Sequence, residues 1–318
     1  MELIRRAVID VGTNSVKLLV ADVRGSEVLP VWEGSTQTRL GKSFYETHCL
    51  QAEPIQRTAE AVAEFATRAR GLQAISVRAI ATSAARDAIN APELIASIRK
   101  ASGLETAIIS GDQEADWGFL GVTTDPALRH APLLLLDVGG GSTEFILGQG
   151  DERHFCESFP VGTVRLLEKL PHSDPPTKEQ LNSYRRAISD FLDDQVRAKL
   201  EPALKCQKSR PDRSQEIQLV GTGGTSTVLG GMEAELGTFD RERLEGTRLR
   251  RERLHWHVEH LWRLSLSERK QIIGLPPNRA DVILAGSAIY EAVMDHFDFN
   301  ELRITTRGLR FAAVLEAP

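Results

Sequence analysis

Two glycine-containing turns in this sequence have the residue types and the spacing that phosphate binding requires. Residues 10–15 read DVGTNS and residues 137–142 read DVGGGS, so each turn places a hydroxyl residue three positions after its first glycine. Glycine lets backbone N–H groups converge on an oxyanion without a Cβ in the way, and hydroxyl groups add donors. The turns lie 127 residues apart (137 − 10), which predicts two similar domains that each present one turn at a shared cleft. The candidate phosphate-binding residues are Gly12, Thr13, Asn14, Ser15, Gly139, Gly140, Gly141, Ser142 and Thr143.

An aspartate precedes each turn and needs a partner of its own. Asp10 and Asp137 end their strands, and a carboxylate cannot contact a phosphate directly without repulsion. A metal ion, a water or a lysine between the two groups removes this repulsion, and Mg²⁺ (or Mn²⁺) suits the place because it takes oxygen ligands and keeps waters. Glu144, seven residues after Asp137, supplies another oxygen, so Asp10, Asp137 and Glu144 are the candidate metal ligands. The structural alternative is that both aspartates cap ordinary tight turns.

A third glycine-rich turn lies at residues 219–232, LVGTGGTSTVLGGM. Its Gly223, Gly224 and Thr225 are candidates to close over a nucleoside or over further phosphates. An equally weighted alternative is a helix N-terminus packed tightly on a strand. Neither of the first two turns contains the G-x-G-x-x-G dinucleotide fingerprint. Residues 39–43 (RLGKS) match only the tail of a Walker A loop, because Thr36 stands where the first glycine of that loop should be.

The elements that position these turns alternate between strands and helices, which indicates an α/β architecture. Expected strands are 6–12, 15–25, 75–82, 105–111, 133–138, 217–221 and the start of 301–315. Expected helices are 52–72, 83–103 with a break near Pro92, one starting near 112, one after 180 to about Leu204, and the end of 301–315. Expected loops are 33–44 and the basic segment 205–216.

The domain boundary is expected within residues 125–132, DPALRHAP, because this stretch has two prolines and no periodicity. The first domain then spans residues 1–126 and the second spans residues 127–306. The C-terminal helix, within residues 307–318, is expected to pack back on the first domain.

Composition excludes several classes of protein. The 318 residues carry a formal net charge of −5 and a pI near 6.0, which does not fit a nucleic-acid-binding protein. The cysteines Cys49, Cys156 and Cys206 are few and far apart, so we expect neither a disulfide framework nor a thiolate zinc site. Such sparse cysteines predict a cytoplasmic location. No apolar run reaches the length of about 18 residues that a membrane span needs.

Several segments resemble one family in its own order. The turns are similar to the phosphate motifs of the actin-like ATPase superfamily, and the chain more closely resembles the exopolyphosphatase/guanosine pentaphosphate phosphohydrolase (Ppx/GppA) family. The most specific signal is DVGGGSTE together with the preceding ISGDQEA. The other matching segments are TRLGKS, ATSAARDAINAPELI, FPVGTVRLLE, GLPPNRADVILAGSAIYEAV and TTRGLRFAAVL.

The resemblance implies two actin-like (ribonuclease H-like) α/β domains with the active site in the cleft between them. It implies hydrolysis of a terminal phosphoanhydride with Mg²⁺ or a similar ion, and a homodimer. The family's catalytic base corresponds to Glu114, its cleft arginine to Arg86, and the glutamate before the base is replaced here by Gln113. Without the resemblance, Glu114 reads as an acid in the first turn of a helix and Arg86 as a surface residue paired with Asp87.

The expected function is an exopolyphosphatase that releases orthophosphate from inorganic polyphosphate. Short chains are favoured, because longer family members have an additional C-terminal helical domain. The alternatives are a guanosine pentaphosphate (pppGpp) 5′-phosphohydrolase, a kinase of the same superfamily, and a non-catalytic alarmone sensor, which Gln113 keeps open.

Two other clusters are weaker candidates for a site. Residues 240–260 contain six arginines, which suit either a path for a polyanion or, with their interleaved acids, a solvated helix face; the second is favoured. His255, His257 and His260 lie close in sequence, but a zinc site would need better spacing and one more ligand.

Overall fold

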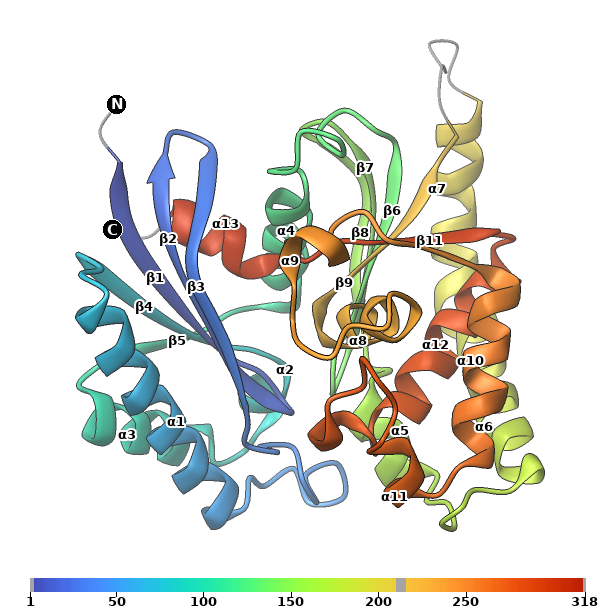
Figure 1. Ribbon diagram of the computed structural model, residues 1–318, viewed down its shortest axis with the longest axis horizontal. Coiled ribbons are helices and arrows are strands. Elements are labelled where there is room, and N and C mark those ends of the chain that lie inside the picture. The colour runs from blue at the N-terminus through green and yellow to red at the C-terminus, as the bar shows by residue number, and fades with distance from the viewer. Residues whose placement is uncertain (1–2, 210–215, 317–318) are drawn as a thin grey trace. The chain divides into compact units, whose positions relative to one another are not determined.

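The computed structural model describes residues 3–209 and 216–316. The chain divides into two compact units, Met1–Asp125 with Arg307–Pro318, and Pro126–Thr306. Each unit is built around its own mixed β-sheet with helices on it (Figure 1).

The first unit has a five-stranded sheet. Its strands are β1 (Ile4–Val11), β2 (Ser15–Arg24), β3 (Glu27–Gln37), β4 (Ser76–Ala81) and β5 (Thr106–Ile108). They lie in the order β3-β2-β1-β4-β5. The pairs β3–β2 and β2–β1 are antiparallel, and the pairs β1–β4 and β4–β5 are parallel. The strand order is that of a ribonuclease H-like domain, as predicted.

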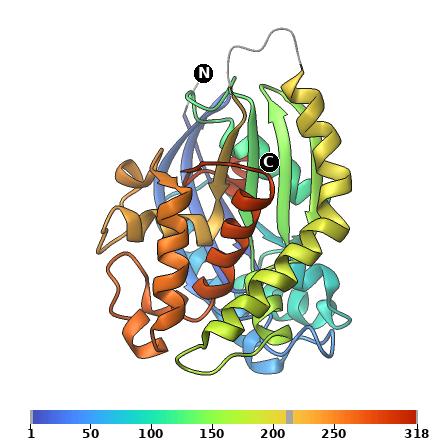
Figure 2. The same cartoon turned by 90° about the vertical axis from the view of Figure 1, so that its right-hand side faces the viewer.

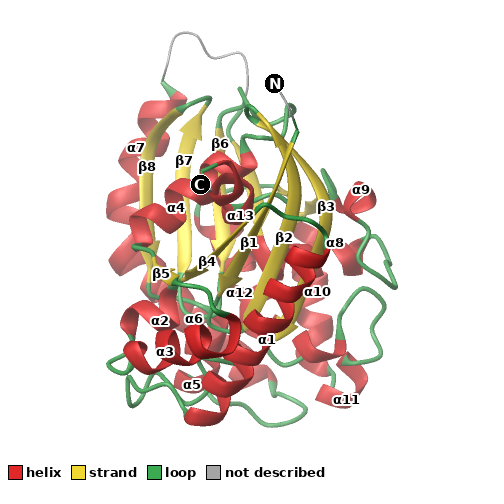
Figure 3. Ribbon diagram, turned by 90° about the vertical axis from the view of Figure 1, so that its left-hand side faces the viewer, coloured by secondary structure: helices red, strands yellow, loops and turns green. Residues whose placement is uncertain are grey.

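Strand alternation divides this sheet into two apolar faces. Ile9 and Val11 pack on the side of α1 (Ala52–Gly71) and α3 (Ala91–Ser102), whereas Val8 packs with α4 and α13. The helices α4 (Gly111–Val122) and α13 (Leu309–Leu315) lie side by side on this second face, and α2 (Ser83–Asp87) follows the end of β4 (Figures 1 and 3).

The second unit repeats the same sheet. Its strands are β6 (Leu133–Val138), β7 (Thr143–Gln149), β8 (Glu152–Phe159), β9 (Gln218–Thr222), β10 (Arg248–Arg250) and β11 (Glu301–Ile304). The order β8-β7-β6-β9-β11 matches β3-β2-β1-β4-β5, and β10 adds an antiparallel strand at the edge. The duplication inferred from the two similar turns is therefore present in the strand order.

Helices cover the second sheet, with α6, α7, α10 and α12 on one side of it (Figure 2). The helices are α5 (Thr163–Lys169), α6 (Lys178–Phe191), α7 (Ala198–Lys208), α8 (Gly223–Glu233), α9 (Arg241–Leu244), α10 (Arg251–Arg263), α11 (Leu266–Arg269) and α12 (Ile283–His296). A π-helical turn, Leu192–Arg197, joins α6 to α7, and a 3-10 turn spans Pro277–Arg279. Among the described residues, none of the helices combines the length and apolar character that crossing a membrane requires.

Three sequence-based expectations for local structure were wrong. The loop expected at 33–44 is strand up to Gln37, because β3 is a half-exposed edge strand whose polar residues conceal it. The basic loop expected at 205–216 is helical up to Lys208, and residues 210–215 lie outside the described part. The strand expected at 105–111 is confined to Thr106–Ile108.

The contact between α4 and α13 depends on a glycine. A Cβ at Gly121 would overlap with the backbone carbonyl of Gly308, just before α13. We expect Gly121→Ala to lower the free energy of unfolding by about 1–3 kcal/mol, because the two backbones must separate. Urea denaturation measures this loss. Gly71→Ala is the matched control, since a Cβ there meets no atom within 4 Å and helix propensity favours alanine; equal losses in both variants would contradict the account.

Candidate active site

The two predicted phosphate turns are the same structure made twice. Each is the loop between two antiparallel strands, closed by a backbone hydrogen bond from the first residue of the loop to the carbonyl three residues later. Gly12 N donates to Ser15 O at 3.0 Å, and Gly139 N donates to Ser142 O at 3.0 Å. The strand pairs that flank the loops match as well, with Val11 opposite Val16 and Val138 opposite Thr143.

A neighbouring segment holds the carbonyl groups of the first turn. The backbone N–H groups of Thr38 and Arg39 both donate to Asn14 O, at 3.1 and 3.0 Å, and Gly41 N donates to Thr13 O at 2.8 Å. The segment after β3 therefore acts as a support beneath the turn.

The second turn has an equivalent support at the start of α5. Thr163 N donates to Gly139 O at 2.9 Å, and the backbone N–H groups of Val164 and Arg165 donate to Gly140 O at 2.8 and 3.1 Å. The Arg165 side chain adds a bond from Nε to the next carbonyl, that of Gly141, at 2.8 Å.

Each support contains a glycine that the approach requires. A Cβ at Gly41 would overlap with the Thr13 side chain, and a Cβ at Gly162 would lie 2.6 Å from the carbonyl of Gly140. Both glycines lie in segments that resemble the family, TRLGKS and FPVGTVRLLE, but neither was predicted to have a role. The signal that could have found them is a second glycine motif after each turn, within residues 38–43 and 159–168.

The supports leave the amide groups of the turns without partners. Within the described residues, the backbone N–H groups of Thr13, Asn14, Gly140 and Gly141 donate to no backbone carbonyl. Because the carbonyls are engaged and the amides are not, each turn presents net positive polarity, which is the arrangement that binds an oxyanion. The structure thus places four of the predicted phosphate-binding residues where their N–H groups are available.

Side-chain donors differ between the two turns. In the first, Asn14 Nδ2 and Ser15 Oγ are buried and have no hydrogen-bond partner among the described residues, as expected of a site that a ligand completes. In the second, the hydroxyls are already used: Ser142 donates to the Glu144 carboxylate and Thr143 donates to a backbone carbonyl. The predicted role of these two residues therefore rests on their backbone groups.

Two predicted metal ligands lie directly opposite each other in the second unit. Asp137 and Glu144 are paired across β6 and β7, and the Glu144 side chain is 3% exposed. Glu144 Oε1 accepts hydrogen bonds from Ser142 at 2.8 Å and Ser158 at 2.7 Å, which stabilise its charge. Gly223 abuts this pair, since a Cβ there would overlap with Asp137 Oδ1.

The third glycine-rich turn is the N-terminus of a helix, the alternative that was given equal weight. Helix α8 begins at Gly223, which has a φ of 83°, and the Thr222 side chain does not cap it. The Thr225 hydroxyl donates to the backbone carbonyl of Val138 at 3.0 Å, so α8 is tied to the second phosphate turn. A helix N-terminus held beside that turn adds a further place for an anion.

Arg279 is a candidate site residue that sequence analysis missed. Its guanidinium nitrogens would lie 3.4 Å from a Cβ at Gly224, and within the described residues it makes no hydrogen bond or ion pair. Burial lowers the pKa of Arg279, although Asp281 acts in the opposite sense. A desolvated cation beside a helix N-terminus needs an anion, and the quoted segment GLPPNRAD could have suggested it.

A second arginine fixes the loop that carries Arg279. Arg269 is 1% exposed, and its guanidinium donates to Ala280 O at 2.8 Å and to Leu264 O at 2.6 Å. These bonds connect Leu264, before α11, to Ala280, after the 3-10 turn, and Ala280 is the neighbour of Arg279 in the chain. The position of Arg279 is therefore restrained.

The predicted base and the predicted cleft arginine form an ion pair in the first unit. Arg86 Nη1 donates to Glu114 Oε2 at 2.9 Å and to the carbonyl of Ile109 at 3.2 Å. Ser110 caps α4 by accepting from Gln113 N at 3.1 Å, which fixes Glu114 one residue later. The ion pair fixes the position of the Glu114 carboxylate, and the Gln113 side chain is exposed on the helix.

Asp10, the third predicted metal ligand, lies in the first unit. Burial raises the pKa of Asp10, while the cations Lys17 and Arg310 act in the opposite sense. Lys17 stands opposite Asp10 in the strand register, at the place that Glu144 occupies opposite Asp137.

No group of three or more His, Cys, Asp or Glu side chains gathers as a metal site in the described part of the chain. Mg²⁺ nevertheless needs only one or two carboxylates when waters and phosphate oxygens complete its shell. The opposed pair of Asp137 and Glu144 fits that requirement.

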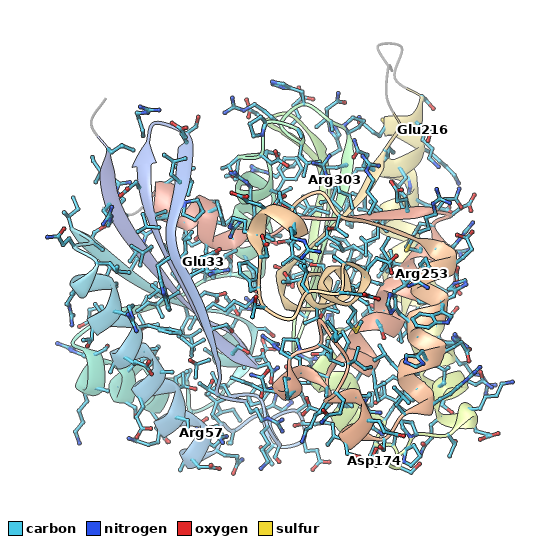
Figure 4. All side chains as sticks on the ribbon, in the orientation of Figure 1. Glu33, Arg57, Asp174, Glu216, Arg253 and Arg303 are labelled. Atoms are coloured by element: carbon cyan, nitrogen blue, oxygen red, sulfur yellow. The ribbon has the colours of Figure 1, made fainter. Side chains whose placement is uncertain are left out.

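The histidines and arginines of residues 240–260, the two weaker candidates for a site, contact neighbouring side chains. His255 contacts Asp295 at 3.0 Å, His257 contacts Glu233 at 2.9 Å, and His260 stacks on Trp256. The arginines of residues 240–260 are distributed over α9, β10 and α10, where several pair with acids; Arg253, on α10, contacts Glu233 at 3.0 Å (Figure 4).

Comparisons with known proteins give the family and the fold of this chain. The model of the Ppx/GppA phosphatase family matches residues 19–316. Exopolyphosphatase 2 of Mycobacterium tuberculosis is 34% identical over 301 residues, which cover 92% of this chain and 90% of that protein. The crystal structure of the Aquifex aeolicus Ppx/GppA family member has a TM-score of 0.77 at 27% identity, covering 99% and 97% of the two chains. An exopolyphosphatase from Cytophaga hutchinsonii has a TM-score of 0.84 at 25% identity, covering 97% and 96%.

The raised pKa of Asp10 makes a prediction for stability. The ordinary pKa of this carboxyl is 3.8. At a pH above the raised pKa of the folded protein, the ionised carboxylate destabilises the fold to the full extent. The destabilisation decreases as the pH falls through the raised pKa and is absent below pH 3.8. We therefore expect Asp10→Asn to raise the Tm at pH 7 in the presence of a chelator, with a gain that shrinks towards pH 4.

Asp22→Asn is the control with the opposite sign. The hydrogen bond from Arg5 lowers the pKa of Asp22, so this substitution should lower the Tm at pH 7, by less as the pH falls. A decrease in Tm for Asp10→Asn at pH 7 would show that the Asp10 carboxylate stabilises the metal-free fold.

Proposed function

We propose an exopolyphosphatase activity for this chain, which belongs to the Ppx/GppA phosphatase family and is therefore a phosphoanhydride hydrolase. The proposed reaction removes the terminal phosphate of inorganic polyphosphate, with short chains preferred, and releases orthophosphate. The relative named Exopolyphosphatase 2, matched over nine-tenths of its length, supports this substrate class.

The observation that carries the proposal is the pair of turns with engaged carbonyls and unpaired amides. Thr13 and Asn14 in one turn, and Gly140 and Gly141 in the other, offer N–H groups that no backbone carbonyl in the described part of the chain accepts. Four such donors suit a terminal phosphoryl group, whose charge is spread over several oxygens. In the proposed complex both turns bind the same phosphoryl group, and Arg279 neutralises a further phosphate.

Glu114 is the proposed general base. It accepts a proton from the water that attacks the terminal phosphorus, and the oxygen that bridges to the rest of the chain leaves with the remaining polyphosphate. Arg86 fixes the carboxylate through its Nη1, while its Nη2 has no hydrogen-bond partner among the described residues and remains for a phosphate oxygen. Most of the rate enhancement then comes from positioning and charge neutralisation.

Asp137 and Glu144, with Asp10 from the first unit, would hold Mg²⁺ or Mn²⁺ directly or through water. The ion supplies positive charge next to the phosphate oxygens and removes the repulsion between them and the carboxylates. The homodimer and the cytoplasmic location remain predictions.

One panel of assays tests the substrate. Phosphate release is measured from short polyphosphate, long polyphosphate, pppGpp and ATP, each with Mg²⁺ or Mn²⁺ and without an acceptor. The proposal expects the highest kcat/KM for short polyphosphate and loss of release with a chelator. A higher kcat/KM for pppGpp would make the chain an alarmone phosphatase, and binding of pppGpp without any release would make it a sensor.

The base is tested by replacing a carboxylate with its amide. We expect Glu114→Gln to lower kcat by about 100-fold or more, because the amide cannot accept the proton of the attacking water, and to leave the Kd for short polyphosphate nearly unchanged. Asp112→Asn, the same change two residues earlier on the exposed side of α4, should leave kcat within about twofold. A kcat near the unsubstituted value in Glu114→Gln would remove Glu114 from the mechanism.

A further inference from the structure

Four buried side-chain donors on the first unit have no acceptor. They are Arg6 Nε, Ser76 Oγ, Arg78 Nη1 and Trp117 Nε1, and none of them has a hydrogen-bond partner among the described residues. Buried polar groups in folded proteins are almost always paired with protein or with a bound molecule. Four unpaired donors therefore need an explanation when they occur together.

Strand register places these residues on one face of the sheet. Arg6 lies beside Ser76 and Val8 lies beside Arg78 in the parallel pair of β1 and β4. Alternation puts Arg6 on the same side as Val8, and Val8 packs with Trp117 and with α13. This is the face that α4 and α13 cover (Figure 3).

The arginines are close to the tryptophan and to the helix end. The Arg78 guanidinium carbon lies 5.7 Å from the centroid of the Trp117 ring. Arg6 Nη1 donates to the carbonyl of Leu315, at the end of α13, at 2.8 Å. We call Arg6, Ser76, Arg78 and Trp117 the Arg6–Arg78 cluster.

The cluster has positive charge without a matching carboxylate. Within the described residues, Arg78 makes no hydrogen bond or ion pair, and Arg6 donates only to the backbone carbonyls of Val314 and Leu315, at the end of α13. Arg6 and Arg78 are each partly exposed as whole residues, although the unpaired donor atoms are buried, and Trp117 is 4% exposed. A water molecule could accept from two donors, but it would leave both charges uncompensated.

We propose that the Arg6–Arg78 cluster binds a small inorganic oxyanion. Two guanidinium groups, a hydroxyl and an indole N–H match an acceptor with several oxygens and a negative charge. The cluster is separate from the phosphate turn, because Gly12 lies six residues further along β1 than Arg6, about 20 Å for an extended strand. Trp117 is on α4 one turn after Glu114, so an anion in the cluster would contact the helix that carries the proposed base.

The indole N–H of Trp117 reports on this site directly. The chain has four tryptophans, so its ¹⁵N spectrum contains four indole resonances, and Trp117→Phe identifies the one that belongs to the cluster. The full-length protein is titrated with sodium sulfate, with sodium chloride added to keep the ionic strength constant. We expect the Trp117 indole resonance to shift along a saturable curve, and Arg78→Gln to weaken the fitted affinity by at least about tenfold.

Two variants control the experiment. Arg68 lies over Trp32 with a similar geometry, 5.5 Å from the ring centroid, so Arg68→Gln should move the Trp32 resonance and leave the Trp117 titration unchanged. Arg279→Gln changes the proposed active-site cation in the other unit and should also leave it unchanged. The resonances of Trp256 and Trp262 show that Arg78→Gln is folded.

The proposal is wrong if the Trp117 resonance does not move with sulfate, or if it moves to the same extent in folded Arg78→Gln. It is also wrong if Arg279→Gln removes the shift, because the anion would then be bound at the proposed active site. Failure of the polyphosphate assays would not affect this test, since sulfate binding is measured without turnover.

Discussion

The proposed phosphate site depends on hydrogen bonds to the backbone carbonyls of two loops. Each loop joins antiparallel strands, and each would expose carbonyls and amides equally if it were isolated. The segment 38–41 and the start of α5 occupy the carbonyls, so that the central amides, those of Thr13 and Asn14 and of Gly140 and Gly141, are left for a ligand. The glycines Gly41 and Gly162 are needed for this, because a side chain at either would push the support away from its loop.

The two units repeat one architecture but differ in charge at equivalent positions. Opposite the strand-ending aspartate, the first unit has Lys17 and the second has Glu144. The first unit thus partly neutralises its buried aspartate with cations, whereas the second gathers two carboxylates and stabilises one of them with hydroxyl donors. The first unit carries the ion pair of Glu114 with Arg86, the proposed base and its partner, and the second unit carries the opposed carboxylates Asp137 and Glu144, the proposed cation ligands.

Sequence patterns predicted those parts of the site that are contiguous along the chain. The turns, their aspartates and the α/β order follow from local residue types, and the resemblance to the family added Glu114 and Arg86. The supports could not be predicted, because Gly41 and Gly162 act on loops that lie 28 and 22 residues earlier (41 − 13 and 162 − 140). Arg279 was missed for the same reason, since only folding brings it to Gly224. The hydroxyl of Thr143 was expected at the phosphate, but burial directs it to a carbonyl of its own unit.

The most direct test of the central claim is a crystal structure of the protein with orthovanadate, a mimic of the phosphoryl group in transfer, and Mg²⁺. The account predicts one anion that accepts hydrogen bonds from the backbone N–H groups of residues 13–14 and 140–141, with the carbonyls of both loops still bound to their supports. An anion that contacts neither loop, or loops whose carbonyls have left their supports, would contradict it.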